Sequence, residues 1–180
     1  MPTSVKILYM ALLEIVKYPE PVLHTVGKPV EQFDDGLKRL VADMFETMYD
    51  AKGVGLAAPQ VNVSQRLFVM DVPDEEGKSN KIVAVNPEVI YVEGEKIGDE
   101  GCLSFPSIYV PIQRNQRAIL RAQDTTGNWF ELDGENLAAR CVLHETDHCD
   151  GIVFLNRMTK LKREMAKRKI KKLQKTGQWE

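Results

Sequence analysis

The chain has 180 residues, of which 43% are hydrophobic and 28% are charged, and its formal net charge is −2. This balance is typical of one globular domain and excludes a disordered chain, and no apolar run is long enough for a membrane span. The three cysteines have no disulfide-framework spacing, so we expect a reducing compartment and a cytoplasmic location.

The charge is unevenly distributed along the chain. Residues 157–180 hold ten Lys/Arg and two Glu, whereas the rest of the chain holds 14 basic and 24 acidic side chains. A basic tail on an acidic body suggests that the two parts contact different partners. A solvated, Lys-rich surface helix explains the same composition, and the sequence leaves both readings open.

The N-terminal segment "ILYMALL" at 7–13 is apolar, but Glu14 interrupts it and no small-residue cleavage site follows. We therefore expect a dispensable extension rather than a signal peptide, and Met10 is itself a candidate start site. The absence of repeats and low-complexity linkers favours a simple division of the chain. The expected parts are an extension at 1–11, a main domain at 12–157, and a basic C-terminal helix at 158–180 that belongs to the same domain or serves as a docking tail.

The first predicted helix runs from about Leu37 to Ala51. Asp34 or Asp35 can cap its N-terminus, apolar residues recur at helical spacing, and Gly53 follows its end. This apolar stripe indicates core packing. The next segment, "GVGLAAPQV" at 53–61, is rich in small residues and is predicted to be a turn.

Strand-like runs follow in the middle of the chain, at 66–72, 81–95 and 116–124. The last run is expected to pair with 129–132 through the turn "TTGN" at 125–128. Helical patterns then cover 135–151, closed by Gly151, and 160–175. Because strands and helices do not alternate regularly, we predict an α+β fold with small mixed or antiparallel sheets around the helix at 135–151 and a C-terminal helix.

The helix at 135–151 contains the motif "HETDH" at 144–148. Residues four apart lie on one face of a helix, so the imidazoles of His144 and His148 can point at the same place. This HExxH pattern is typical of metallohydrolases, in which the two histidines bind a metal ion and the glutamate, here Glu145, handles protons.

A catalytic site of this kind needs a third protein ligand. Cys141 lies one helical turn too far back to reach, and Cys149 points about 100° away from His148 around the helix. Spacing alone cannot select Cys102, but elimination favours it, while His24 and several carboxylates remain open. A thiolate ligand would suit ferrous iron as well as zinc and would be vulnerable to oxidation.

Three segments, "GVGLAAPQ" at 53–60, "EGCLS" at 100–104 and "HETDH" at 144–148, occur in this order and spacing. Together they resemble the three motifs of the peptide deformylases, and the resemblance extends from about residue 12 to the basic tail. Members of that family remove the formyl group from the N-terminal methionine of nascent proteins and release formate. The resemblance implies that N-formylmethionyl nascent peptides are the substrate and that residues 12–157 form the catalytic domain.

The resemblance also implies roles for individual residues. The metal ligands would be Cys102, His144 and His148, and Glu145 would be the acid/base residue. The Gln60 side chain and the Leu103 backbone N–H would form the oxyanion site, and Gly55 would let the substrate approach. The metal implied is Fe²⁺ physiologically, with Zn²⁺, Ni²⁺ or Co²⁺ as replacements.

Other expectations concern the surroundings of this site. Val54, Leu137 and Cys141 are candidates for an apolar methionine pocket, although ordinary core packing explains them equally well. Each metal-bound imidazole should donate its other N–H to an acceptor, and Glu100 or Asp147 could serve. The basic tail could contact ribosomal RNA, with affinity that falls as salt rises.

Two departures from the family pattern are Leu143, where Gln commonly stands, and Cys149, where Leu is usual. Cys149 would place an additional thiol near the centre. Two other classes of function would explain part of this sequence. An HExxH endopeptidase should have a second lobe and commonly a third His or Glu, and an RNA-binding module would leave the three motifs unexplained.

Overall fold

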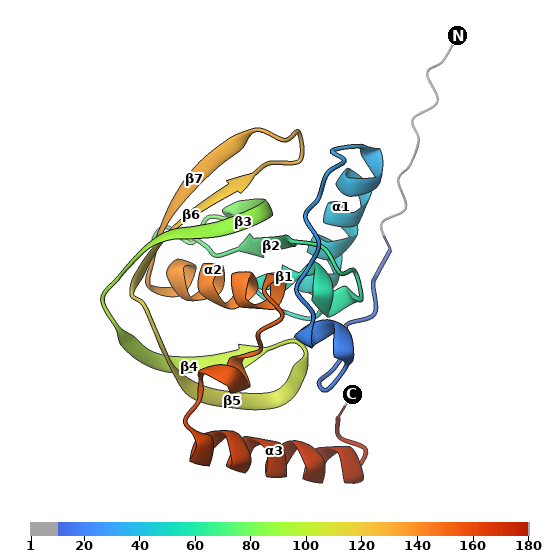
Figure 1. Ribbon diagram of the computed structural model, residues 1–180, viewed down its shortest axis with the longest axis vertical. Helices are drawn as coiled ribbons and strands as arrows, with labels where there is room; N and C mark the ends of the chain where they lie inside the picture. The colour runs from blue at the N-terminus through green and yellow to red at the C-terminus, as the bar shows by residue number, and fades with distance from the viewer. Residues whose placement is uncertain (1–10, 180) are drawn as a thin grey trace.

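The computed structural model describes residues 11–179 (Figure 1), so what we expect of residues 1–10 lies outside the described residues. The helices are α1 (Asp35–Asp50), α2 (Asn136–Cys149) and α3 (Lys160–Lys175), and short 3-10 helices are η1 (Pro21–His24), η2 (Ala58–Val61) and η3 (Phe154–Arg157). The strands are β1 (Gly55–Ala57), β2 (Leu67–Asp71), β3 (Lys81–Glu93), β4 (Lys96–Cys102), β5 (Phe105–Arg114), β6 (Arg117–Gln123) and β7 (Trp129–Glu135). Within 11–179, none of the helices has the length and apolar character needed to cross a membrane.

The strands form two antiparallel sheets. The larger sheet has the order β1-β2-β3-β6-β7, and β4 and β5 form a separate two-stranded sheet. Figure 1 shows α2 between the two sheets, with α1 beside β1 and β2. The predicted α+β fold, with small antiparallel sheets around the HExxH helix and a helix at the C-terminus, is confirmed.

The larger sheet is buried on both faces near β2. Phe68 and Met70 pack with Val142 of α2, whereas Leu67 and Val69 alternate with them and pack with Met44 and other residues of α1. Side chains alternate across a strand, so a strand covered on both faces reads as a continuous apolar run. This explains the "LFVM" sequence of β2 and fixes α2 against the sheet.

A third apolar cluster lies on the other side of β5. It joins Leu23 of η1, Phe105 and Ile108 of β5, Phe154 of η3, and Ile170 of α3. Figure 1 accordingly shows α3 on the side of β5 away from α2. The C-terminal helix therefore packs on the body through one apolar face.

Several predicted elements agree closely with the structure. The helix predicted at 37–51 is α1, and the carboxylate of Asp34 caps it by accepting a hydrogen bond from the Leu37 N–H at 3.0 Å. The predicted hairpin is β6–β7, in which Gln123 pairs with Trp129. Gly151 follows α2 with a φ of +70°, a left-handed conformation that suits glycine.

Two local predictions were incomplete. The hairpin of β4 and β5 was not expected, because Pro106 and Pro111 and the polar run of β4 hide the strand pattern. The segment at 53–61, predicted to be a turn, contains strand β1 and helix η2. Its small residues reflect close packing against α2 rather than a turn, as the contacts of Gly55 below show.

The packing of α3 predicts the effect of two substitutions on this helix. Ile170 is 2% exposed, so Ile170→Ala should lower the free energy of unfolding by about 2–5 kcal/mol. Leu161, on the same helix, is 72% exposed, and Leu161→Ala should change stability by no more than about 0.5 kcal/mol. Urea denaturation of both variants makes the comparison. Equal, small effects would mean that α3 does not pack on the body.

Candidate metal centre and substrate cavity

Helix α2 places the HExxH residues in the interior. His144 is 7% exposed, Glu145 is 4% exposed and His148 is 1% exposed. The two imidazoles lie one above the other on one helix face, and their Nε2 atoms are 3.2 Å apart. Two histidines side by side in the core are costly unless their nitrogens have partners.

Cys102 approaches this pair from the end of β4. Its Sγ lies 3.3 Å from the Nε2 of His148, and the three donor atoms of Cys102, His144 and His148 all lie within 4.8 Å of one another. A tetrahedral ion with Zn–N bonds of about 2.0 Å and Zn–S bonds of about 2.3 Å would separate its ligands by about 3.3–3.6 Å. The 3.3 Å between the Cys102 Sγ and the His148 Nε2 and the 3.2 Å between the two Nε2 atoms therefore lie close to the spacing that a tetrahedral divalent ion requires.

Glu100 fixes the orientation of one imidazole. The Nδ1 of His144 lies 2.6 Å from the Glu100 carboxylate, which can only accept a hydrogen bond when ionised. Nδ1 then carries the proton and Nε2 presents its lone pair to the cluster, the arrangement that a metal ligand requires. Of the two acceptors expected from the sequence, Glu100 contacts an imidazole. Asp147 instead accepts hydrogen bonds from Arg114 and Arg157.

Two arginines hold Glu100 in place. Arg114 donates to both carboxylate oxygens, at 2.7 and 3.1 Å, and Arg140 donates at 2.9 Å. Although burial acts in the opposite direction, the hydrogen bonds from His144 and Arg114 hold the pKa of Glu100 far below its usual range. Glu100 is therefore ionised at neutral pH and supplies a fixed negative charge behind His144.

The electrostatic environment of the cluster favours a cation. Burial alone would lower the pKa of His144, but Cys102 and Glu100 raise it well above its ordinary value. For His148, burial and the neighbouring His144 lower the pKa well below its ordinary value. The Nδ1 of His148 is buried and has no hydrogen-bond partner among the described residues. The negative groups around His144 therefore favour positive charge at its ring, which a proton or a bound cation can supply.

Glu145 lies beside this cluster and forms no ion pair within residues 11–179. Its Oε2 atom is buried and unpaired within residues 11–179, and burial raises the pKa of the Glu145 carboxyl to about 7. A carboxyl group with such a pKa can both accept and donate a proton near neutrality. The backbone of Gly55 lies against it: a Cβ at this position would be 2.5 Å from the Glu145 Oε1 and 2.7 Å from the Cys141 Sγ. Only glycine leaves room for the carboxylate here.

Gln60 presents its amide nitrogen to the same place. Its Oε1 accepts a hydrogen bond from the Ala57 N–H at 2.9 Å, which fixes the orientation of the amide. The Nε2 then points to the Ser104 Oγ at 3.2 Å and to the Cys102 Sγ at 3.5 Å. Leu103 occupies the turn between β4 and β5, next to Cys102.

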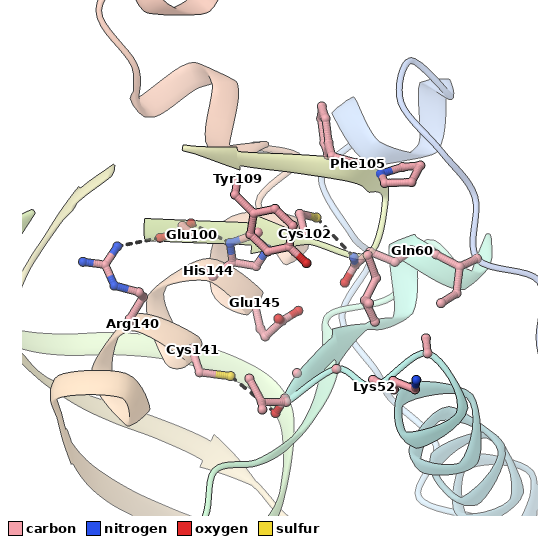
Figure 2. Close-up of a pocket in the computed structure, with 18 of the residues that line it drawn as sticks. Lys52, Gln60, Glu100, Cys102, Phe105, Tyr109, Arg140, Cys141, His144 and Glu145 are labelled. Atoms are coloured by element: carbon pink, nitrogen blue, oxygen red, sulfur yellow. Dashed lines mark hydrogen bonds and ion pairs between the residues drawn. The ribbon is translucent and has the colours of Figure 1, made fainter. Parts of the chain in front are cut away.

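A cavity of about 500 Å³ opens onto these groups. Figure 2 shows Glu145 near the centre of the view, with Cys141 on one side of it and Gln60 on the other. The lining residues include, from the sequence expectations, Val54, Gly55, Gln60, Cys102, Leu103, Leu137, Cys141, His144 and Glu145. His148 lies beneath this lining, where its ring contacts the cluster from the core side.

Other candidate residues lie elsewhere. His24 is exposed in η1, where its ring packs edge-on against Tyr18 at 5.6 Å, so it is not the third member of the cluster. Cys149 is fully buried in the core between α2 and the larger sheet, and burial raises the pKa of its thiol to about 12. Its thiol is therefore not part of the Cys102 cluster.

Sequence reasoning missed Arg114 and Arg140. They resemble ordinary surface cations in the sequence, and neither belongs to a recognisable motif. One signal for Arg114 was present in β5, where alternate residues point to the same side of the strand. Ile108 and Ile112 are buried on that side, and Arg114, two residues after Ile112, is buried with them. A charged residue in register with buried apolar ones indicates a buried ion pair.

Comparisons with known proteins agree with this geometry. Residues 12–164 match the family described as polypeptide deformylase. The chain is 48% identical over 170 residues to a peptide deformylase of Acidobacterium capsulatum, covering 94% of this chain and 100% of that protein. A crystal structure of a peptide deformylase from Legionella pneumophila is 46% identical and superposes with a TM-score of 0.85, covering 93% and 98% of the two chains. One from Ehrlichia chaffeensis is 37% identical with a TM-score of 0.86, covering 93% and 99%.

The geometry of the cluster predicts the effect of replacing its sulfur. Cys102→Ser should weaken binding of a divalent ion by more than the roughly 10–100-fold that loss of an outer hydrogen bond costs. Cys149→Ser is the matched control, because it removes a buried thiol next to His148 that does not face the cluster, and it should retain one ion per chain. Elemental analysis after dialysis measures both. Full metal content in Cys102→Ser would show that the sulfur is not needed to bind the ion.

Proposed function

Because the chain belongs to the peptide deformylase family, it is a metal-dependent hydrolase that removes the formyl group from nascent peptides, and we propose that Cys102, His144 and His148 hold its metal ion. The observation that carries this proposal is the convergence of the Cys102 sulfur with two imidazole nitrogens. The Glu100 hydrogen bond, which aims the His144 lone pair at the same point, supports it independently.

Ferrous iron is the proposed physiological ion, with Zn²⁺, Ni²⁺ or Co²⁺ able to replace it. One sulfur and two imidazole nitrogens form a mixed donor set that accepts each of these ions. A bound divalent ion would supply Lewis-acid chemistry, which polarises a carbonyl and brings the pKa of water close to neutrality. The sulfur of Cys102 borders the cavity, which makes this site sensitive to oxidation.

Glu145 is the proposed proton carrier. Water adds its oxygen to the formyl carbon and gives a proton to the Glu145 carboxylate, which then passes this proton to the leaving amine nitrogen as the C–N bond breaks. Formate and a free N-terminal amine are the products. The burial of Glu145, which raises the pKa of its carboxyl to about 7, suits both halves of this cycle, because the group can take up and release a proton near neutrality.

Gln60 and Leu103 are the proposed oxyanion donors. The Gln60 Nε2 lies 3.5 Å from the Cys102 Sγ, so it borders the position where the formyl oxygen would become negatively charged. The Leu103 N–H follows Cys102 directly in the chain. One preorganised donor of this kind typically contributes about 3 kcal/mol to stabilising such a charge. Gly55 completes the arrangement, since its missing side chain leaves room for Glu145 and for the substrate.

The cavity suits an extended peptide with an apolar first side chain. Val54, Leu137 and Cys141 line it beside the cluster and are the proposed contacts of the methionine side chain. Within residues 11–179, β1 and β4 are each paired along one edge only. The cavity lies between them, so the substrate backbone can hydrogen-bond to a free strand edge.

Residues 12–157 are proposed to form the catalytic domain, with 158–180 as a basic helix attached to the same body. The buried Ala166 and Ile170 support this attachment. A cytoplasmic location is proposed because the substrate is a nascent chain and because Cys102, Cys141 and Cys149 are all free thiols.

The outward face of α3 is proposed to contact the ribosome. It carries exposed basic side chains, namely Lys160, Lys162, Arg168, Lys171, Lys172 and Lys175. Phosphate groups of RNA attract such a face, and the attraction weakens as salt rises. An enzyme that acts on nascent chains benefits from proximity to the exit of the growing peptide.

The proposed chemistry is tested by formate release from formyl-Met-Ala, assayed without oxygen on protein loaded with Fe²⁺ or Ni²⁺. The wild-type protein should release formate, and Glu145→Gln should keep its metal but lose about 10²–10⁴-fold in kcat, because the proton carrier is removed. Full activity of the metal-loaded variant would contradict the role of Glu145. Cleavage of unformylated peptides would indicate a protease.

The ribosome contact is tested by replacing three exposed cations of α3, Arg168, Lys171 and Lys172, with glutamine. Loss of three phosphate contacts should weaken cosedimentation with ribosomes and reduce the slope of log affinity against log salt by about 2–3.

The matched control replaces Lys38, Lys78 and Lys96, which are exposed cations outside α3, with the same change in net charge. Formate release should be the same in both triple variants. Equal cosedimentation of the two would argue against docking through α3.

A further inference from the structure

The mouth of the substrate cavity carries two lysines that the proposed chemistry does not use. Lys17 precedes η1, and Lys52 follows α1, and both line the cavity. Neither ammonium group forms an ion pair or hydrogen bond within residues 11–179. The acidic residues nearest to them in sequence, Glu14, Glu20 and Asp50, do not line the cavity.

The other charged groups of the cavity are accounted for. Glu100 is neutralised by Arg114 and Arg140, and Glu145 lies at the reacting centre. Figure 2 shows Lys52 and Arg140 on opposite sides of the cavity, with Glu145 between them. The lysines therefore give the mouth an uncompensated positive charge, although the chain outside its basic tail is acidic.

The distance between Lys52 and the Glu145 carboxylate region has an upper limit set by the chain. Gly55 lies against the Glu145 carboxylate, and Lys52 is three residues before it. Three residues of extended chain span at most about 10 Å. A substrate bound with its formyl group at the metal and its methionine side chain in the apolar pocket advances about 3.3 Å per extended residue, so its next one or two residues reach this mouth.

We infer that Lys52 and Lys17 select substrates, favouring nascent peptides with an acidic side chain at the first or second position after the formylmethionine. This inference rests on the proposed function, because it takes the orientation of the substrate from the metal site. The contact forms in a solvent-exposed mouth, so it tunes the preference rather than determining whether a peptide is processed.

The test compares formyl-Met-Glu-Ala-amide with formyl-Met-Gln-Ala-amide, and formyl-Met-Ala-Glu-amide with formyl-Met-Ala-Gln-amide, at low ionic strength. Glu and Gln have nearly the same shape, so the ratio of their kcat/KM values isolates the charge. In the wild-type protein the ratio should exceed one in at least one pair, by about two- to fivefold for each lysine involved. The difference should lie mainly in KM, because the ion pair is equally present before and during the reaction.

Variants assign the preference to these lysines. Lys52→Gln and Lys17→Gln should each lower the ratio, and Lys52→Glu should bring it below that of Lys52→Gln. Lys38→Gln is the matched control. It makes the same change in net charge on α1, where Lys38 pairs with Asp35 at 3.6 Å outside the cavity, and should leave the ratio unchanged. Added salt should reduce the wild-type ratio toward one.

A ratio of one in both peptide pairs, or a ratio that neither Lys52→Gln nor Lys17→Gln changes, overturns the inference. In either case, normal formate release would still support the proposed deformylase activity. Absence of formate from all four peptides with metal-loaded protein would instead contradict the proposed function itself. The two failures are therefore distinguishable in one set of assays.

Discussion

The hydrogen bond between Glu100 and His144 is the interaction on which the site depends. At 2.6 Å, with Glu100 held ionised, it places the proton on Nδ1 and leaves the Nε2 lone pair facing Cys102 and His148. Glu100 lies in the strand that also ends at Cys102, so one strand supplies both the sulfur of the cluster and the group that orients His144 on α2. Without this hydrogen bond the three donor atoms would be close but not aimed at one point.

The charged side chains around Glu100 keep its carboxylate in position against His144. Arg114 connects Glu100 of β4 with Asp147 of α2, and all three side chains are buried. Buried ion pairs often contribute little net stability, because desolvation offsets their attraction, but breaking one leaves an uncompensated charge at a cost of about 3–5 kcal/mol. The network therefore acts mainly on orientation. It ties the two-stranded sheet to α2, and the cavity for the peptide forms where this sheet faces β1.

The sequence allowed the fold class, α1, the β6–β7 hairpin and α3 to be predicted, because each has a strong periodic or turn signal. It also allowed His144 and His148 to be paired, since helical spacing is a local property. The position of Cys102 beside them could only be inferred by elimination and from family resemblance, because it depends on the β4–β5 hairpin. That hairpin has prolines and polar residues at positions where a recognisable strand would have alternating apolar residues. The role of Arg114 depends on how the hairpin packs against α2, which no local pattern shows.

The central claim is that one sulfur and two imidazoles hold the same ion, and X-ray absorption spectroscopy of protein loaded with a single divalent metal tests it most directly. The structure predicts one sulfur scatterer at about 2.3 Å together with nitrogen or oxygen scatterers at about 2.0–2.1 Å for zinc. A spectrum with only nitrogen and oxygen neighbours would place the sulfur of Cys102 outside the coordination sphere and contradict the account.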